Sequence, residues 1–141
     1  MNRSITDKTE VRVRFNEADS LGIVWHGNYI RYFEDGRESF GMKHGLDYLA
    51  VFNKGYILPI VKIECNYKRP LAYGDRLLIE TTYTPCAAAK IHFHYKIFNA
   101  TTGLLAADGY TIQVFLDKAT NTLELTNPPF FEEWKRAMGM M

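Results

Sequence analysis

Cysteine is scarce in this sequence, and its two cysteines, Cys65 and Cys86, lie far apart and outside any CxxC pattern. A disulfide framework needs several pairs at regular spacing, and a zinc knuckle needs cysteines separated by two residues. The sequence therefore suggests neither of them. We expect both thiols to be packing residues, as unpaired cysteines in folded proteins often are.

An excess of charge of one sign is also lacking, because 17 Lys and Arg residues are balanced by 16 Asp and Glu residues. Nucleic acids and anionic membrane surfaces attract proteins that carry a strong basic excess. The balance, with 47% hydrophobic and 23% charged residues, is typical of an ordinary folded protein. We therefore expect neither a nucleic-acid partner nor a membrane partner.

Long hydrophobic runs are absent as well. The N-terminal segment MNRSITDKTEVRVRF alternates and carries charge, and no later run approaches the about 18 apolar residues of a membrane span. Internal repeats, linkers and low-complexity segments are also lacking. These features predict a cytoplasmic protein without a signal peptide, folded as a single domain over residues 1–141.

What the sequence does contain is a change of hydrophobic period. Residues 9–15, TEVRVRF, alternate in the pattern of a half-buried strand. From about residue 28 the positions of Tyr29, Phe33, Gly36 and Phe40 predict an amphipathic helix of roughly four turns. Glycine in a helix interior costs about 1 kcal/mol relative to alanine, so Gly36 indicates the close approach of a neighbouring element.

The rest of the chain is nearly all strand. A short helical turn is expected over 46–52, and a closing helix from about Asn127. Four strands are expected between them, at 56–68, 75–84, 89–99 and 104–116. This order predicts an α+β fold, in which a five-stranded antiparallel sheet packs on one long helix.

One helix cannot cover both faces of such a sheet. The face away from the helix would carry Ile60, Leu78, Phe98 and Val114 among its polar residues. This is more apolar surface than a monomer comfortably exposes. We therefore expect a homo-oligomer, either a dimer or a tetramer.

The stretch FNEADSLGIVWHGNY at residues 15–29 places acids on a turn directly before the predicted helix. The first N–H groups of a helix lack intrahelical partners, and the helix dipole adds positive charge, so a helix start can hold a developing oxyanion. Gly27 or Asn28 would be the N-cap. The carboxylate of Asp19 beside these amides supplies the two parts that hydrolysis by acyl transfer needs.

This pattern alone leaves the role of each residue open. An aspartate ahead of a helix is usually a cap or a solvated turn residue. A free aspartate side chain has a pKa of about 3.9 and is a weak general base at neutral pH, so direct attack on a carbonyl is as plausible as activation of water. We expect Glu17 to be a surface charge, and His26 to be a packed or capping side chain that could also transfer protons.

The longer stretch FNEADSLGIVWHGNYIRYFEDGRESF resembles the opening motif of the hotdog-fold acyl-CoA thioesterases, specifically the 4-hydroxybenzoyl-CoA thioesterase family and its YbgC-like relatives. The matching elements are the acids of E-A-D, the G-I-V-W run, the His-Gly-Asn-Tyr helix start, and Phe33 and Glu34 followed by Arg37. A second stretch, YKRPLAYGD at 67–75, is similar to a turn of that family. The resemblance implies a hotdog fold, in which the sheet wraps around the helix and two protomers join their sheets.

The resemblance also implies roles for single residues. Asp19 matches the catalytic aspartate, which is the nucleophile or general base, and His26 matches the position whose backbone amide polarises the thioester carbonyl and whose side chain is also implicated. The substrate-binding positions are Gly22 in the turn, Trp25 beside the acyl pocket, Gly27 and Asn28 at the helix start, and Glu34. Glu34 could equally pair with Arg31 or Arg37 across a helix turn.

One departure from the family concerns coenzyme A. In the 4-hydroxybenzoyl branch, basic residues before the fourth strand meet its phosphates, whereas this sequence has alanine at positions 87–89, followed by Lys90. Lys68 and Arg69 are then candidates to hold the nucleotide. An acyl carrier protein, which presents the same pantetheine arm without the nucleotide, is an alternative acyl donor. No cofactor is expected beyond the coenzyme A or phosphopantetheine of the substrate.

We therefore expect an enzyme that hydrolyses a small to medium aliphatic or aromatic acyl thioester to the free acid and thiol. One rival is an enoyl thioester hydratase or dehydratase with His26 as its base, and another is a non-catalytic protein that binds acyl groups or pantetheine. His92 and His94 could supply two metal ligands, but no third ligand is evident nearby in the sequence, so we expect no metal site.

Overall fold

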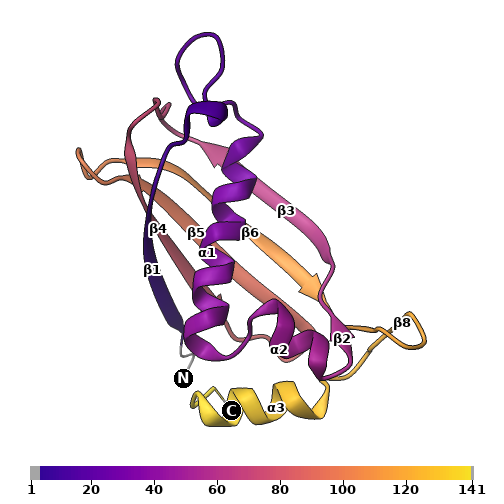
Figure 1. Ribbon diagram of the computed structural model, residues 1–141. Coiled ribbons are helices and arrows are strands. Elements are labelled where there is room, and N and C mark those ends of the chain that lie inside the picture. The colour runs from indigo at the N-terminus through magenta and orange to yellow at the C-terminus, as the bar shows by residue number, and fades with distance from the viewer. Residues whose placement is uncertain (1–3, 141) are drawn as a thin grey trace.

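The structure of the chain is a computed structural model that describes residues 4–140. A curved sheet of five antiparallel strands surrounds one long helix, α1 (Asn28–His44), which lies across its inner face (Figure 1). The strand order is β1-β4-β5-β6-β3. The bounds are β1 Ile5–Arg12, β3 Ile60–Tyr67, β4 Arg76–Thr84, β5 Lys90–Asn99 and β6 Leu105–Val114. The α+β fold predicted from the sequence is confirmed.

Shorter elements close the two ends of this arrangement. A single 3-10 turn, η1 (Phe15–Glu17), precedes α1, and a short helix, α2 (Tyr48–Asn53), follows it. A small second sheet has the order β2-β7-β8, with bounds Tyr56–Ile57, Leu116–Asp117 and Thr122–Leu123. The closing helix α3 (Pro129–Ala137) lies below the end of α1 (Figure 1). None of the helices formed by residues 4–140 is both long and apolar enough to cross a membrane.

The core lies between α1 and the inner face of the sheet. Phe33 stacks on Tyr95 with ring centroids 4.4 Å apart, and Phe40 meets Phe93 edge to face at 5.0 Å. All four side chains are almost fully buried. Because burial of one such ring contributes about 1.5–3 kcal/mol, these contacts fix which side of α1 faces the sheet.

Gly36 lies on this side of α1, where the helix meets β4. A β-carbon at this position would collide with Oγ1 of Thr81 and would lie 2.8 Å from Cγ2 of Ile79. Both neighbours are fully buried and cannot move aside cheaply. The close approach that the mid-helix glycine predicted is therefore confirmed.

Replacing Gly36 with alanine should lower the free energy of unfolding by about 1–2 kcal/mol. Alanine is more favourable than glycine in a helix by about 1 kcal/mol, whereas overpacking a tight core costs about 1–3 kcal/mol. Because the added methyl group would collide with Thr81, we expect a cost at the upper end of the overpacking range, which exceeds the gain in helix propensity. Urea unfolding followed by circular dichroism measures the difference. Ser39→Ala on the same helix is the control for propensity alone, and a Gly36→Ala protein more stable than the native chain would contradict the packing explanation.

The predicted strand 56–68 is broken in the structure. Proline has no N–H to donate to a sheet, and at Pro59 the chain leaves β2 and begins β3 at Ile60. The register then shifts between Ile60 and Lys62, so that Ile60 stands opposite Gln113, whose side chain points inward. The assignment of Ile60 to the outer face was wrong, because this bulge breaks the alternation that the prediction assumed.

The first strand is also displaced from its predicted position at 9–15. β1 spans Ile5–Arg12, and Phe15 belongs to η1, where its side chain is 80% exposed. Alternation in TEVRVRF continues for three residues after the strand has ended, so pattern alone placed the strand too late.

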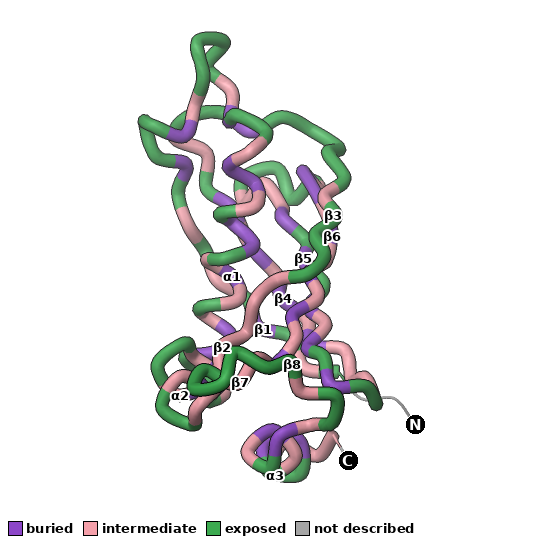
Figure 2. The backbone as a smooth tube through the Cα atoms, turned by 90° about the vertical axis from the view of Figure 1, so that its right-hand side faces the viewer, coloured by how far each residue is buried: buried purple, intermediate pink, exposed green. Residues whose placement is uncertain are grey.

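Strand β3 forms one edge of the sheet and pairs only with β6 among the described strands. Val61 and Ile63 on it are 58% and 41% exposed, and Figure 2 shows exposed residues along this strand. On the outer face, Leu78, Phe98 and Val114 are half-buried, while α1 and α2 lie on the opposite side of the sheet (Figure 1). An apolar edge of this kind is a surface on which a second strand can pair.

Candidate active site

Asp19 lies at the base of a tight turn before α1. Its N–H donates to the carbonyl of Ile23 at 2.8 Å, and the N–H of Gly22 donates to its carbonyl at 3.0 Å. Gly22 has a φ of +80°, in the left-handed region that favours glycine. One carboxylate oxygen of Asp19 accepts the N–H of Leu21 at 2.8 Å, while the exposed carboxylate makes no ion pair within the described chain. The turn therefore presents the carboxylate to solvent in a fixed direction.

The two sequence stretches that carried the family resemblance lie side by side. The N–H of Val24 donates to the carbonyl of Leu71 at 2.7 Å, and Ile23 forms a β-bridge with Ala72. The N–H of Tyr73 also reaches the carbonyl of Gly22, at 3.4 Å. Backbone hydrogen bonds from the turn at 67–75 thus hold the Asp19 turn in position.

The start of α1 is held by side chains that leave its amides open. Gly27 is the N-cap, which agrees with one of the two predicted caps, and Asn28 is the first helical residue. The hydroxyl of Tyr67 donates to the carbonyl of His26 at 2.9 Å. The backbone N–H groups of His26 and Gly27 donate to no residue among 4–140. These two amides, at the positive end of the helix dipole, can receive an oxyanion.

Trp25 and His26 form the exposed wall of this helix start. Their rings lie 4.9 Å apart, and Trp25 is 52% exposed. The Trp25 ring lies against the α-carbon of Gly27, because a β-carbon there would collide with it. An apolar surface beside open amides suits a thioester whose acyl chain lies along the wall.

Glu17 is not the surface charge that the sequence suggested, since it is only 3% exposed. One oxygen accepts the N–H of Arg14 and the hydroxyl of Tyr32, and the other accepts the Arg14 guanidinium at 2.7 Å. Burial alone would raise the pKa of Glu17, but these hydrogen bonds together lower it below its ordinary value. The Glu17 carbonyl also accepts from Trp25 and Asn28, so this residue holds the helix start in position.

The remaining predicted binding residues do not gather in one protomer. Lys68 and Arg69 follow β3 near the Asp19 turn, where Arg69 donates to the carbonyl of Leu105 at 3.0 Å. Lys90 begins β5 and pairs with Val114, at the opposite end of the sheet. No single basic patch therefore forms from these three residues within one described chain.

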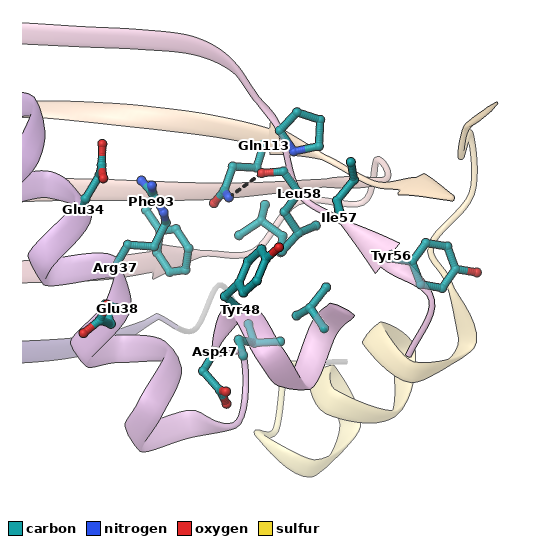
Figure 3. A pocket seen from close by; sticks show the side chains of 14 residues that line it. Glu34, Arg37, Glu38, Asp47, Tyr48, Tyr56, Ile57, Leu58, Phe93 and Gln113 are labelled. Atoms are coloured by element: carbon teal, nitrogen blue, oxygen red, sulfur yellow. Dashed lines mark hydrogen bonds between the residues drawn. The ribbon is translucent and has the colours of Figure 1, made fainter. Parts of the chain in front are cut away.

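Glu34 also lies away from Asp19, one to two turns into α1. It lines a cavity of about 490 Å³ between the middle of α1, α2, the start of β5 and the end of β6 (Figure 3). Arg37 and Gln113 line the same cavity, and sequence reasoning did not single out either as a binding residue. A signal for Gln113 was available, because it is a polar residue at an inward position of an otherwise small or apolar strand face.

The chain is similar to known proteins over most of its length. Residues 13–137 match a family model described as the thioesterase-like superfamily. The chain is 33% identical to YneP of Bacillus subtilis, over 79% of this chain and 80% of that protein. Among solved structures it is similar to DHNA-CoA thioesterase from Staphylococcus aureus, with a TM-score of 0.84, 26% identity and coverage of 95% and 91% of the two chains. It is also similar to a mutant 4-hydroxybenzoyl CoA thioesterase in complex with 4-hydroxybenzoyl CoA, with a TM-score of 0.77, 26% identity and coverage of 94% and 98%.

Proposed function

Because this chain belongs to the thioesterase-like superfamily and is a thioester hydrolase, we propose that it hydrolyses acyl-CoA thioesters to the free acid and coenzyme A, with Asp19 as the reacting carboxylate. One observation carries the proposal. The exposed Asp19 carboxylate is fixed in a turn directly ahead of a helix start whose first amides, at His26 and Gly27, are open.

The proposed reaction follows from these groups. The thioester carbonyl oxygen would accept hydrogen bonds from the open amides, which stabilise the negative charge that develops as the carbonyl carbon is attacked. In one route Asp19 takes a proton from water, the hydroxide oxygen bonds to the carbonyl carbon, the C–S bond breaks and the thiolate recovers a proton. In the other, Asp19 itself attacks, the thiolate leaves, and water then cleaves the mixed anhydride to regenerate the carboxylate.

A dimer formed through β3 belongs to the same proposal. Two copies of one edge strand related by a two-fold axis pair antiparallel, and the exposed apolar residues Val61 and Ile63 would be covered by this pairing. Exposed Phe15 and Leu21, at 80% and 79%, add apolar surface around Asp19 that a partner would cover. Antiparallel pairing brings the C-terminal end of β3, where Tyr67 meets His26, beside the N-terminal end of the partner's β3.

The experiment that tests the proposed function follows thiol release by the purified protein from a panel of aliphatic and aromatic acyl-CoAs. The same acyl groups are offered in parallel on an acyl carrier protein. We expect turnover with coenzyme A thioesters, at a catalytic efficiency within the ordinary range of about 10⁴–10⁸ M⁻¹s⁻¹ for at least one of them. Turnover confined to the carrier-protein thioesters would mean that the acyl donor is an acyl carrier protein and not coenzyme A. Hydration of an enoyl thioester without thiol release would mean that the enzyme is a hydratase and not a hydrolase.

A further inference from the structure

The two open amides at the start of α1 belong to two successive peptide units that are held in different ways. The N–H of His26 shares its peptide unit with the carbonyl of Trp25, which accepts the N–H of Asn28 at 2.9 Å within the turn itself. The N–H of Gly27 shares its unit with the carbonyl of His26. That carbonyl accepts the N–H of Tyr29 at the longer distance of 3.3 Å, and its shorter hydrogen bond comes from β3. The second amide therefore depends on a partner from outside the turn.

This partner is Tyr67, the last residue of β3. Its hydroxyl donates to the His26 carbonyl at 2.9 Å, across 41 positions of the sequence. Its ring meets the buried ring of Tyr29 edge to face, with centroids 5.0 Å apart. The N–H of the next residue, Lys68, donates to the carbonyl of Ala106 at 2.8 Å and holds the end of the strand. Contacts of both the ring and the backbone therefore direct the hydroxyl at one carbonyl.

The direction of this hydrogen bond follows from its two groups. A backbone carbonyl oxygen can only accept, so the phenol must donate. Burial raises the pKa of Tyr67 above its ordinary value of about 10, so the hydroxyl keeps its proton at neutral pH. The hydrogen bond is therefore present at the pH at which an ionised aspartate can react.

The hydrogen bond to the carbonyl also acts on the amide of the same peptide unit. A trans peptide is rigid and planar, with its C=O and N–H pointing in opposite directions. The direction of the His26 carbonyl therefore sets the direction of the Gly27 N–H. A hydrogen bond accepted by the carbonyl also polarises the amide, because hydrogen bonds in a chain strengthen one another. Both effects favour a negative charge opposite the Gly27 N–H.

We propose that Tyr67 is a positioning residue for thioester hydrolysis, which fixes and polarises the Gly27 amide that receives the oxyanion. The inference rests on the proposed function, because the oxyanion forms when the thioester held beside Asp19 is attacked. Tyr67 acts through the peptide unit between His26 and Gly27. It adds the C-terminal end of β3 to a site that otherwise consists of the Asp19 turn and the start of α1.

Tyr67→Phe tests the proposal, because it removes the hydroxyl and keeps the ring that packs on Tyr29. Loss of a complete oxyanion donor costs about 100- to 1,000-fold in kcat, whereas this variant keeps the donor and loses its orientation. We therefore expect kcat for acyl-CoA hydrolysis to fall by about 10- to 100-fold. KM should change by less than about threefold, because the oxyanion exists only in the transition state. A native kcat in Tyr67→Phe would overturn the proposal.

Tyr110→Phe is the matched control. Tyr110 lies on β6 opposite Glu64 of β3, and its ring meets those of His92 and His94 on the outer face of the sheet. The variant thus loses a tyrosine hydroxyl beside the same edge strand but on the face away from α1. Its kcat and KM should equal those of the native chain. An equal fall of kcat in both variants would assign the effect to the sheet as a whole and overturn the positioning role.

The carbonyl of a bound acyl group reports the strength of the amide donors directly. Infrared difference spectra give the C=O stretching frequency of carbonyl-labelled benzoyl-CoA and hexanoyl-CoA, free and bound to Asp19→Asn, in which slow turnover preserves the thioester. Hydrogen bonds from the two amides should lower this frequency on binding. Adding Tyr67→Phe should remove about half of the shift, because one of the two amides loses its orientation. A shift of the same size with and without the Tyr67 hydroxyl would overturn the proposal.

The infrared measurement separates this inference from the proposed function, because it needs binding and not turnover. If the native protein hydrolyses no acyl-CoA, but the bound carbonyl is shifted and Tyr67→Phe reduces the shift, the proposed function fails and the positioning of the Gly27 amide by Tyr67 stands. If the native protein hydrolyses acyl-CoA, and Tyr67→Phe changes neither kcat nor the shift, the positioning role fails and the proposed function stands.

Discussion

Replacing Asp19 with asparagine is expected to lower kcat for acyl-CoA hydrolysis by about 100- to 10,000-fold, which is the usual loss when a positioned acid–base group is removed. Asparagine has nearly the same shape, and its amide oxygen can still accept the N–H of Leu21. The turn, its bridge to residues 71–73 and the open amides of the helix start should therefore persist. The loss should appear in kcat, because the amide can neither attack the thioester nor accept a proton from water.

Asp117→Asn provides the control for this result. Asp117 also holds a turn, with one carboxylate oxygen accepting the N–H groups of Ala119 and Thr120 at 2.9 and 3.1 Å, but it lies in the small second sheet. Thiol release by this variant should equal that of the native chain. A fully active Asp19→Asn protein with an unchanged circular dichroism spectrum would remove Asp19 from the mechanism and leave the helix start as a binding site alone.

Replacing Glu17 with alanine is expected to lower the free energy of unfolding by about 2–4 kcal/mol at neutral pH. The exposed guanidinium of Arg14 contributes little to this value, since surface ion pairs are screened by solvent. The larger part comes from the Tyr32 hydroxyl, which is fully buried and would lose its acceptor, and from the Arg14 N–H. Urea unfolding of the variant, with the exposed Glu133→Ala as its control, measures the difference.

The contribution of Glu17 should also depend on pH in a defined direction. Its pKa in the folded protein lies below the ordinary value of about 4.3, so the folded state binds this proton less readily than the unfolded chain. The stabilisation is therefore complete above the ordinary value and is lost as the pH falls through the folded pKa. Unfolding of the native chain and of Glu17→Gln at a series of pH values should show a gap that narrows below about pH 4. A gap that is constant down to pH 3 would contradict the role of the ionised carboxylate.

Much of the fold could be predicted from local pattern. The spacing of Tyr29, Phe33 and Phe40 predicted α1 because a helix must place its apolar side chains on one side. Alternation predicted β4 and β5 within about one residue of their bounds, since each of these strands buries one face. The Asp19 turn could be recognised from neighbouring residues alone, because an acid, a glycine that adopts a positive φ and the start of a helix follow one another in the sequence.

The predictions that were wrong depended on partners far along the chain. Glu17 was predicted to be a surface charge, but Tyr32 and the segment around Trp25 pack against it in the folded chain and bury it. Ile60 was placed on the outer face because the bulge against β6 cannot be read from β3 alone. The amide nitrogen of Gln113 donates to the carbonyl of Leu58, 55 residues away in the sequence, and its amide oxygen is left without a partner in the described chain.

The sequence by itself thus determined the helix, most of the strands and the acid ahead of the helix start, because periodicity, turn chemistry and capping act over a few neighbouring residues. The tertiary structure alone decided the register of β3, the burial of Glu17 and the cavity around Gln113. These features arise where elements distant in sequence meet, because packing there decides which polar atoms lose water and which remain without a partner.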